Sequence, residues 1–255
     1  MDVVDGVVTI TLNRPDTHNA FDEHVIAALS GKLDVLRLEK SVNVLVLRGA
    51  GKSFSAGADL NWMKRAAGFS EEQNKSDALA LAGMLNKLAT LQVVTIACVQ
   101  GAAMGGGLGL ASCCDIVIAD KDALFALSEV KLGLIPATIA PYVLRAMGER
   151  HARRYFQTGE RFNGQRAYEI GFVHEIVSGA DDMEDRLQGL LKAVSGNGPD
   201  AMKDAKKLCL DLAGQPITPE LMDDTASRIA RTRAGREAKE GLSAFLEKRK
   251  AEWSS

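Results

Sequence analysis

The sequence has 255 residues, of which 46% are hydrophobic and 25% are charged, and its formal net charge is −2. These values are typical of a folded globular protein and exclude a disordered, collagen-like or disulfide-rich chain. A chain of this length is expected to form one large domain, or one large domain with a small addition.

Charge and cysteine content restrict the partners and the compartment. The isoelectric point is near 6.1 and the single basic run is Lys248-Arg249-Lys250, so no nucleic-acid partner is expected. The four cysteines lack the spacing of metal or redox pairs, which predicts reduced thiols, no metal site and a cytoplasmic location. No export signal is evident, and glycines interrupt the uncharged stretch 88–114, so no membrane span is expected.

The first predicted elements alternate between strand and helix. Residues 7–12 are rich in β-branched side chains and alternate between apolar and polar, which predicts a strand that ends before Asn13-Arg14-Pro15. Residues 44–47 predict a buried strand. Between these strands lies a predicted helix, whose apolar face is formed by Ile26, Leu29, Leu33 and Leu36.

The same alternation continues through the middle of the chain. A second amphipathic helix is predicted from Leu81, Met84, Leu85 and Leu88. Strands follow at 93–99, 116–119 and 172–177, with a short helix between the first two that ends near Cys114. This order predicts an α/β fold with a largely parallel sheet covered by helices. From about residue 199 onward we expect two or three helices and no strand.

Two glycine-containing turns each follow a predicted strand. The segment 49–53 lacks the earlier glycine of a phosphate-binding loop, because position 46 is valine. The glycine cluster at 105–109 has two interpretations: tight backbone packing, or the start of a helix whose N–H groups face a ligand atom. The turn at 54–60 has similar surroundings, so the two turns can direct two amides at one oxygen.

Six segments, taken in order, resemble the enoyl-CoA hydratase/isomerase (crotonase) superfamily. They are Asn13-Arg14-Pro15 with Asn19-Ala20, Phe54-Ser55-Ala56-Gly57-Ala58-Asp59-Leu60, Gln100-Gly101-Ala102-Ala103-Met104-Gly105-Gly106-Gly107, Cys114-Asp115, the segment from Ser128 to Pro136, and Ala244-Phe245-Leu246-Glu247-Lys248-Arg249. The resemblance implies a crotonase-like ββα spiral core in residues 1–195 and a C-terminal helical trimerisation region in residues 196–255.

The resemblance also implies chemistry on an acyl-CoA thioester, with CoA entering as part of the substrate and no further cofactor. It places the oxyanion hole at the backbone amides of Ala58 and Gly106 and the acid–base group at Glu129. It implies a homotrimer or a dimer of trimers. The residues implied to contact CoA are Thr17, His18, Ala56, Asp59 and Leu60, together with Phe245 and Lys248 of an adjacent subunit.

The sequence departs from the family at the acid–base pair. Hydratases of the family have a second glutamate where this sequence has Gly109. Segments 54–64 and 128–142 look most like the branch acting on methylglutaconyl-CoA and on carboxygeranoyl-type or isohexenylglutaconyl-CoA, whose acyl groups have a second carboxylate. We expect that this substrate carboxylate, or a water held near Gly109, replaces the missing glutamate.

Three functions remain open from the sequence. Hydration of a 2-enoyl-CoA with one glutamate is the main hypothesis. Isomerisation of the double bond of a 3-enoyl-CoA is the second, because one glutamate suffices to move a proton between two carbons. The third is a CoA-binding or RNA-binding member without hydratase activity, although the isoelectric point opposes RNA binding.

Overall fold

The computed structural model describes residues 3–254, and the chain divides into two compact units after Leu187. The division falls inside helix α7 (Ala180–Ser195), whereas the sequence-based boundary lies at the last residue of that helix.

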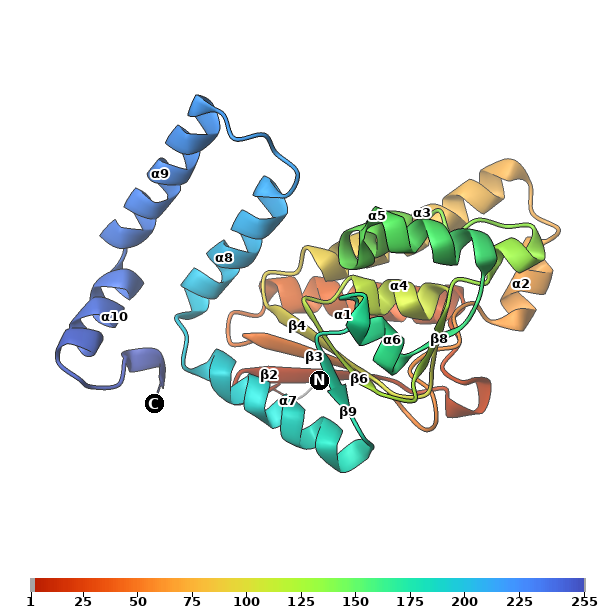
Figure 1. Ribbon diagram of the computed structural model, residues 1–255, viewed down its shortest axis with the longest axis horizontal. Helices are drawn as coiled ribbons and strands as arrows, with labels where there is room; N and C mark the ends of the chain where they lie inside the picture. Colours follow the sequence, from red (N-terminus) through yellow and green to blue (C-terminus); the bar gives the residue numbers. More distant parts are fainter. Residues whose placement is uncertain (1–2, 255) are drawn as a thin grey trace. The chain divides into compact units, whose positions relative to one another are not determined.

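The first unit is built on a sheet whose six strands, among the residues described, run in the order β1-β2-β3-β4-β6-β9 (Figure 1). All neighbours pair in parallel except the short edge strand β1, which the sequence did not predict, so the expected largely parallel sheet is confirmed. Strand β3 is buried on both faces at residues 44–47, whereas β2 buries alternate residues. The strands are β1 (Val3–Val4), β2 (Val7–Leu12), β3 (Val44–Gly49), β4 (Val94–Val99), β6 (Ile116–Asp120) and β9 (Glu175–Val177).

Strand β9 is shorter than predicted. The sequence predicts a strand over 172–177, but the structure has one only over Glu175–Val177. The N–H groups of Phe172 and Val173 both donate to the carbonyl of Ala167, which makes this part a buried turn after helix α6 (Gly164–Glu169). The apolar character of Phe172 and Val173 therefore reflects burial in the core rather than strand pairing.

The helices begin where side chains cap them. Asp22 accepts hydrogen bonds from the N–H groups of His24 and Val25 at the start of α1, and Ser70 forms a capping box at the start of α3. Helix α1 packs against α3, and α4 packs against α5 (Figure 1). The helices of this unit, apart from α7, are α1 (Glu23–Leu38), α2 (Leu60–Ala66), α3 (Glu71–Ala89), α4 (Gly106–Ser112), α5 (Ala140–Thr158) and α6 (Gly164–Glu169), with short 3₁₀ turns η1 (Pro15–Thr17) and η2 (Glu129–Leu132).

A second, small sheet was not predicted from the sequence. It contains β5 (Ala102–Met104), β7 (Leu124–Ala126) and β8 (Phe162–Asn163), in the order β5-β7-β8. Strands β5 and β7 are parallel, so the segments that follow them leave the sheet at the same edge. Gly105 follows β5 and Glu129 lies three residues beyond β7, which brings the two toward each other.

The second unit is helical, as predicted. It contains α8 (Pro199–Leu212), α9 (Pro219–Ala234), α10 (Arg236–Leu246) and the turn η3 (Glu252–Ser254). The Glu237 carboxylate accepts hydrogen bonds from the N–H groups of Asp200 and Ala201 and so caps the start of α8.

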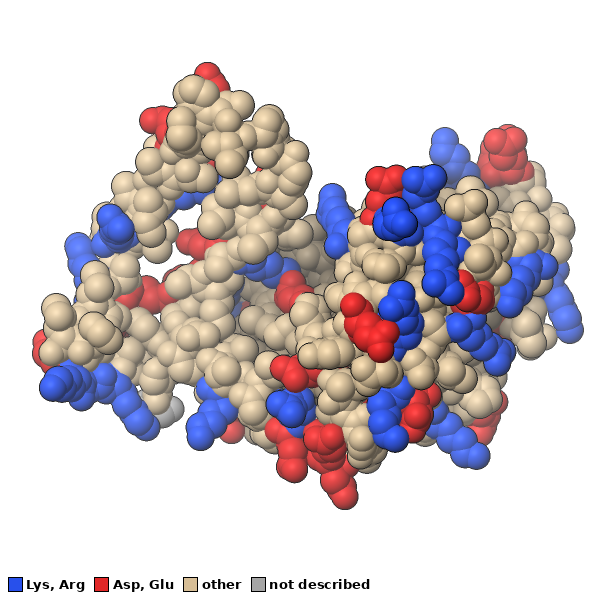
Figure 2. Space-filling model, in the orientation of Figure 1, with Lys and Arg blue, Asp and Glu red and all other residues tan. Residues whose placement is uncertain are grey.

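Charges of both signs are interspersed over the first unit on the face shown in Figure 2. In the part of the chain that is described, no helix has the length and apolar character needed to cross a membrane.

Candidate active site

The two glycine-containing turns lie against each other. Ser55 pairs with β5, because its N–H donates to the Ala102 carbonyl at 2.9 Å and its carbonyl accepts from the Met104 N–H at 3.0 Å. Gly57, with φ +85°, lies against the segment from Met104 to Gly106. A Cβ placed on Gly57 would lie 2.6 Å from the Met104 carbonyl oxygen and 3.4 Å from the Gly106 nitrogen. The turn that precedes Ala58 therefore reaches the start of α4.

Two backbone amides are left without acceptors at this junction. Phe21 pairs with both neighbours of Ala58, donating to the Gly57 carbonyl and accepting from the Asp59 N–H, so the Ala58 N–H faces away from Phe21. Gly106 is the first residue of α4, where an N–H has no acceptor within the helix. Among residues 3–254, neither amide donates to another protein group.

Packing explains two members of the glycine cluster. A Cβ on Gly106 would overlap the Phe21 ring, and one on Gly107 would overlap the Ser55 carbonyl oxygen. The tight-packing interpretation of the cluster is confirmed at these two positions. The same close packing brings Gly106 next to Gly57. The tight-packing interpretation and the interpretation in which the amides face a ligand are therefore compatible.

Glu129 lies at the same end of α4. The Gly105 N–H donates to the Ala126 carbonyl of β7 at 2.8 Å, which holds the start of α4 next to the segment leading to Glu129. A Cβ on Gly105 would lie 2.9 Å from Glu129 Oε1, so a side chain larger than hydrogen at 105 would displace the carboxylate.

The Glu129 carboxylate is partly buried. Its Oε2 is a buried side-chain oxygen with no hydrogen-bond partner within the described residues. Burial raises the pKa of the Glu129 carboxyl above its ordinary value, because the charged form loses its hydration. A carboxyl group with a raised pKa and an oxygen that has no hydrogen-bond partner is suited to accept and return a proton.

The space that a side chain at position 109 would occupy is apolar and already filled. Ile139 fills the side of Gly109: a Cβ at 109 would overlap Ile139 Cγ2 and lie 2.8 Å from Ile139 Cβ. The Gly109 N–H is also engaged, donating to the Gly105 carbonyl at 3.0 Å. Neither the side of Gly109 nor its N–H is therefore open to a ligand.

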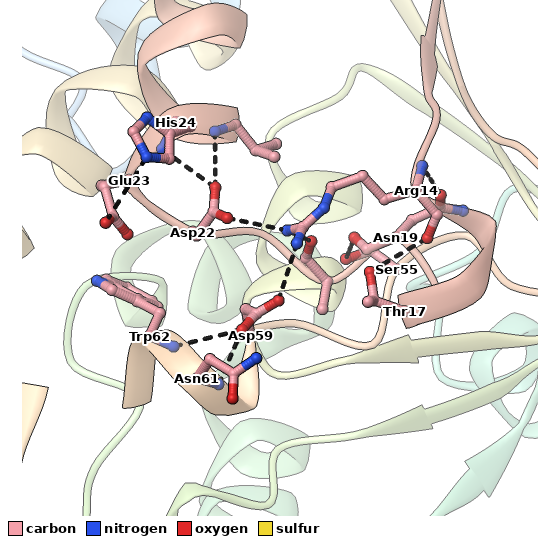
Figure 3. A network of polar contacts seen from close by, with 12 residues as sticks. Arg14, Thr17, Asn19, Asp22, Glu23, His24, Ser55, Asp59, Asn61 and Trp62 are labelled. Carbon is pink, nitrogen blue, oxygen red and sulfur yellow. Dashed lines mark hydrogen bonds and ion pairs between the residues drawn. The ribbon is translucent and has the colours of Figure 1, made fainter. Parts of the chain in front are cut away.

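Arg14 joins the starts of the two helices that flank Ala58 (Figure 3). Its Nη1 lies 3.2 Å from Asp22 Oδ2, and its Nη2 donates to Asp59 Oδ2 at 3.0 Å. Asp22 caps α1, and Asp59 caps α2 by accepting from the N–H groups of Asn61 and Trp62. These bonds, led by that from Asn61, hold the pKa of Asp59 below its ordinary value. Asp59 is thus engaged in structure through its side chain.

Asn19 ties the N-terminal loop to the same turn. Its Nδ2 donates to the carbonyls of Ala50 and Ser53, and its own carbonyl accepts from the Ser55 hydroxyl at 2.9 Å. Asn19 has φ +54°, in the left-handed region that asparagine tolerates better than most residues. The sequence motif contains Asn19 and Arg14, but nothing in their spacing indicates these contacts.

The residues expected to contact CoA lie around this turn and in the second unit. Thr17 and His18 are exposed on the loop after β2, and the His18 carbonyl accepts from the Ala56 N–H at 2.9 Å. Leu60 is 74% exposed at the start of α2. In the second unit, Phe245 is 80% exposed and Lys248 is exposed.

Metal binding has no candidate site here: within residues 3–254, no group of three or more His, Cys, Asp or Glu side chains is arranged to hold an ion.

Comparison with known proteins identifies relatives along the whole chain. The sequence model of the family described as enoyl-CoA hydratase/isomerase matches residues 2–255. A hydroxycinnamoyl-CoA hydratase-lyase from Pseudomonas fluorescens is 31% identical over 254 residues, covering 97% of this chain and 91% of that relative.

Solved structures show the same fold. An enoyl-CoA hydratase from Shewanella pealeana has a TM-score of 0.94 at 47% identity, covering 97% of this chain and 92% of that one. AtuE from Pseudomonas aeruginosa has a TM-score of 0.95 at 37% identity, covering 100% of this chain and 98% of that one.

Proposed function

Because this chain belongs to the enoyl-CoA hydratase/isomerase family, we propose that it is a hydro-lyase that adds water to a 2-enoyl-CoA thioester. The observation that supports this most strongly is the buried, unpartnered carboxylate oxygen of Glu129 near the start of α4, where the amides of Ala58 and Gly106 also have no acceptor.

The two amides act on the thioester oxygen. As water attacks the β-carbon, negative charge moves onto that oxygen and an enolate forms. The N–H groups of Ala58 and Gly106 donate to this oxygen and stabilise the charge, and a donor of this kind contributes about 3 kcal/mol to lowering a barrier. Both donors belong to packed backbone, so they need little reorganisation during the reaction.

Glu129 moves the proton. Its carboxylate takes a proton from the attacking water while the oxygen of that water bonds to the β-carbon. The same carboxyl then gives the proton to the α-carbon of the enolate, which restores the thioester carbonyl and leaves Glu129 ionised again. One carboxyl group thus completes the addition, and water supplies every atom that is added.

The substrate we favour is a branched glutaconyl-type acyl-CoA. Segments 54–64 and 128–142 resemble the branch of the family acting on methylglutaconyl-CoA and isohexenylglutaconyl-CoA. Such an acyl group brings its own carboxylate, which can hold the attacking water where other hydratases use a second glutamate.

We further propose that CoA follows the loop of Thr17 and His18 and passes Ala56, Asp59 and Leu60. Exposure of Thr17, His18 and Leu60 supports this path. Asp59 would contribute through its backbone, since its side chain is engaged by Arg14. Phe245 and Lys248 are exposed, which supports their contacting CoA bound to an adjacent subunit. The assembly we propose is a homotrimer or a dimer of trimers, and its proposed location is the cytoplasm.

Double-bond isomerisation of a 3-enoyl-CoA is the second candidate. It is favoured by Gly109, because a site with one carboxyl group can move a proton between two carbons without water. The oxyanion hole and Glu129 would serve both reactions unchanged.

Assays with crotonyl-CoA, 3-methylglutaconyl-CoA and a 3-enoyl-CoA separate these functions. The proposal expects water addition to at least one 2-enoyl-CoA, lost in Glu129→Gln. Rapid double-bond migration with no water addition would establish the isomerase instead. CoA binding without turnover of any of the three would indicate a binding protein.

A further inference from the structure

The carboxylate of Glu129 and the side chain of Ile139 lie against neighbouring turns of one helix. Gly105 and Gly109 are one helical turn apart, joined by the hydrogen bond from the Gly109 N–H to the Gly105 carbonyl. Glu129 Oε1 occupies the space beside Gly105, and Ile139 Cγ2 and Cβ occupy the space beside Gly109. The next position along α4 from the acid–base group is therefore filled by an apolar side chain.

Ile139 is held firmly in this place. It is 3% exposed and lies at the start of α5, where its carbonyl accepts hydrogen bonds from the N–H groups of Tyr142 and Val143. Helix α5 packs against α4, so the isoleucine cannot withdraw without moving the helix start. A side chain at 109 and an isoleucine at 139 thus exclude each other.

We propose that Ile139 is a specificity-determining residue: by filling the side of Gly109, it denies the protein a second carboxyl group and makes hydration depend on a carboxylate carried by the acyl group. This inference rests on the proposed hydration. It predicts that the wild-type protein prefers 3-methylglutaconyl-CoA to crotonyl-CoA, which has no such carboxylate, by at least about tenfold in kcat/KM.

The steric part is tested by Gly109→Ala, combined with changes at 139. Alone, Gly109→Ala should lower the Tm by a few degrees, because a methyl group has no room there. The overlapping atoms are Cγ2 and Cβ of Ile139. Measured against the corresponding single variant at 139, the Tm loss caused by Gly109→Ala should disappear with Ile139→Gly, shrink with Ile139→Ala and persist with Ile139→Val, which keeps both atoms. A Tm unchanged by Gly109→Ala in the wild-type protein, or the same Tm loss from Gly109→Ala in all three backgrounds, would overturn the steric argument.

The chemical part is tested by Gly109→Glu with Ile139→Gly. The double variant should raise kcat/KM for crotonyl-CoA relative to 3-methylglutaconyl-CoA by at least about tenfold over wild type. It should also add a second ionisation to the pH profile, which a packing change alone does not produce. A folded double variant with the wild-type ratio and one ionisation would overturn the proposal.

Failure of the inference and failure of the proposed function give different results. Wild-type protein that hydrates crotonyl-CoA as well as 3-methylglutaconyl-CoA contradicts the role of Ile139 and leaves hydration intact. Wild-type protein that hydrates neither contradicts hydration itself. Gly83→Ala is the matched control, because this helical glycine has open space around it and should leave both the ratio and the pH profile unchanged.

Discussion

Replacing Gly107 with alanine should separate the two turns that form the oxyanion hole. A Cβ at 107 would overlap the carbonyl oxygen of Ser55 and lie 2.9 Å from its Cβ. The overlapping oxygen belongs to backbone that is paired with β5, so no rotamer change relieves it. Overpacking of this kind costs about 1–3 kcal/mol of stability. Misplacing one donor costs about 3 kcal/mol of transition-state stabilisation, or about a hundredfold in kcat.

Steady-state kinetics with the best 2-enoyl-CoA substrate and a thermal melt test this prediction together. We expect kcat to fall about a hundredfold with KM less affected, because the alignment matters most in the transition state. Gly83→Ala, a helical glycine with open space around it, should keep its kcat and gain up to about 1 kcal/mol of stability. A Gly107→Ala protein that loses stability but keeps kcat within about twofold would refute the reasoning.

Four further predictions concern charged groups near the site. Glu129→Gln should lower kcat by about 10²–10⁴-fold while leaving CoA affinity, measured by calorimetry, nearly unchanged. The raised pKa of Glu129 predicts that kcat/KM rises with pH through a value above the ordinary 4.5. Ionising the Glu129 carboxyl destabilises the folded state as pH rises through that pKa. Glu129→Gln should therefore have a higher Tm than wild type at pH 8 and the same Tm at pH 4. A lower Tm than wild type at pH 8 would contradict the burial of this carboxyl. Arg14→Ala should lower both Tm and kcat, since it removes the link between Asp22 and Asp59, whereas Arg37→Ala, on the exposed last turn of α1, should change neither.

The parallel sheet was predictable because its strands are bounded apolar runs. Residues 44–47 and 93–99 were predicted as strands and form β3 and β4, and four apolar residues at helical spacing marked the buried face of α1. The second sheet escaped prediction because β5, β7 and β8 are two or three residues long, too short to show any periodicity. Their pairing depends on contacts between residues far apart in the sequence.

The candidate site was predictable only where family motifs mark it. Ala58, Gly106 and Glu129 came from the resemblance, and the structure places their segments around the start of α4. The roles of Arg14 and Ile139 could not be read from the sequence. Arg14 bonds Asp59, 45 residues away, and Ile139 meets Gly109, so both roles depend on tertiary packing. The one available signal for the contacts of Arg14 was an aspartate before each helix, Asp22 and Asp59, and such a residue indicates only that it caps the helix.

A crystal structure with a bound acyl-CoA thioester would test the central claim most directly. The account predicts that the thioester oxygen lies about 2.7–3.1 Å from both the Ala58 and the Gly106 nitrogens, with the Glu129 carboxylate facing the α-carbon. A thioester oxygen bound by other groups, or by only one of these amides, would contradict it.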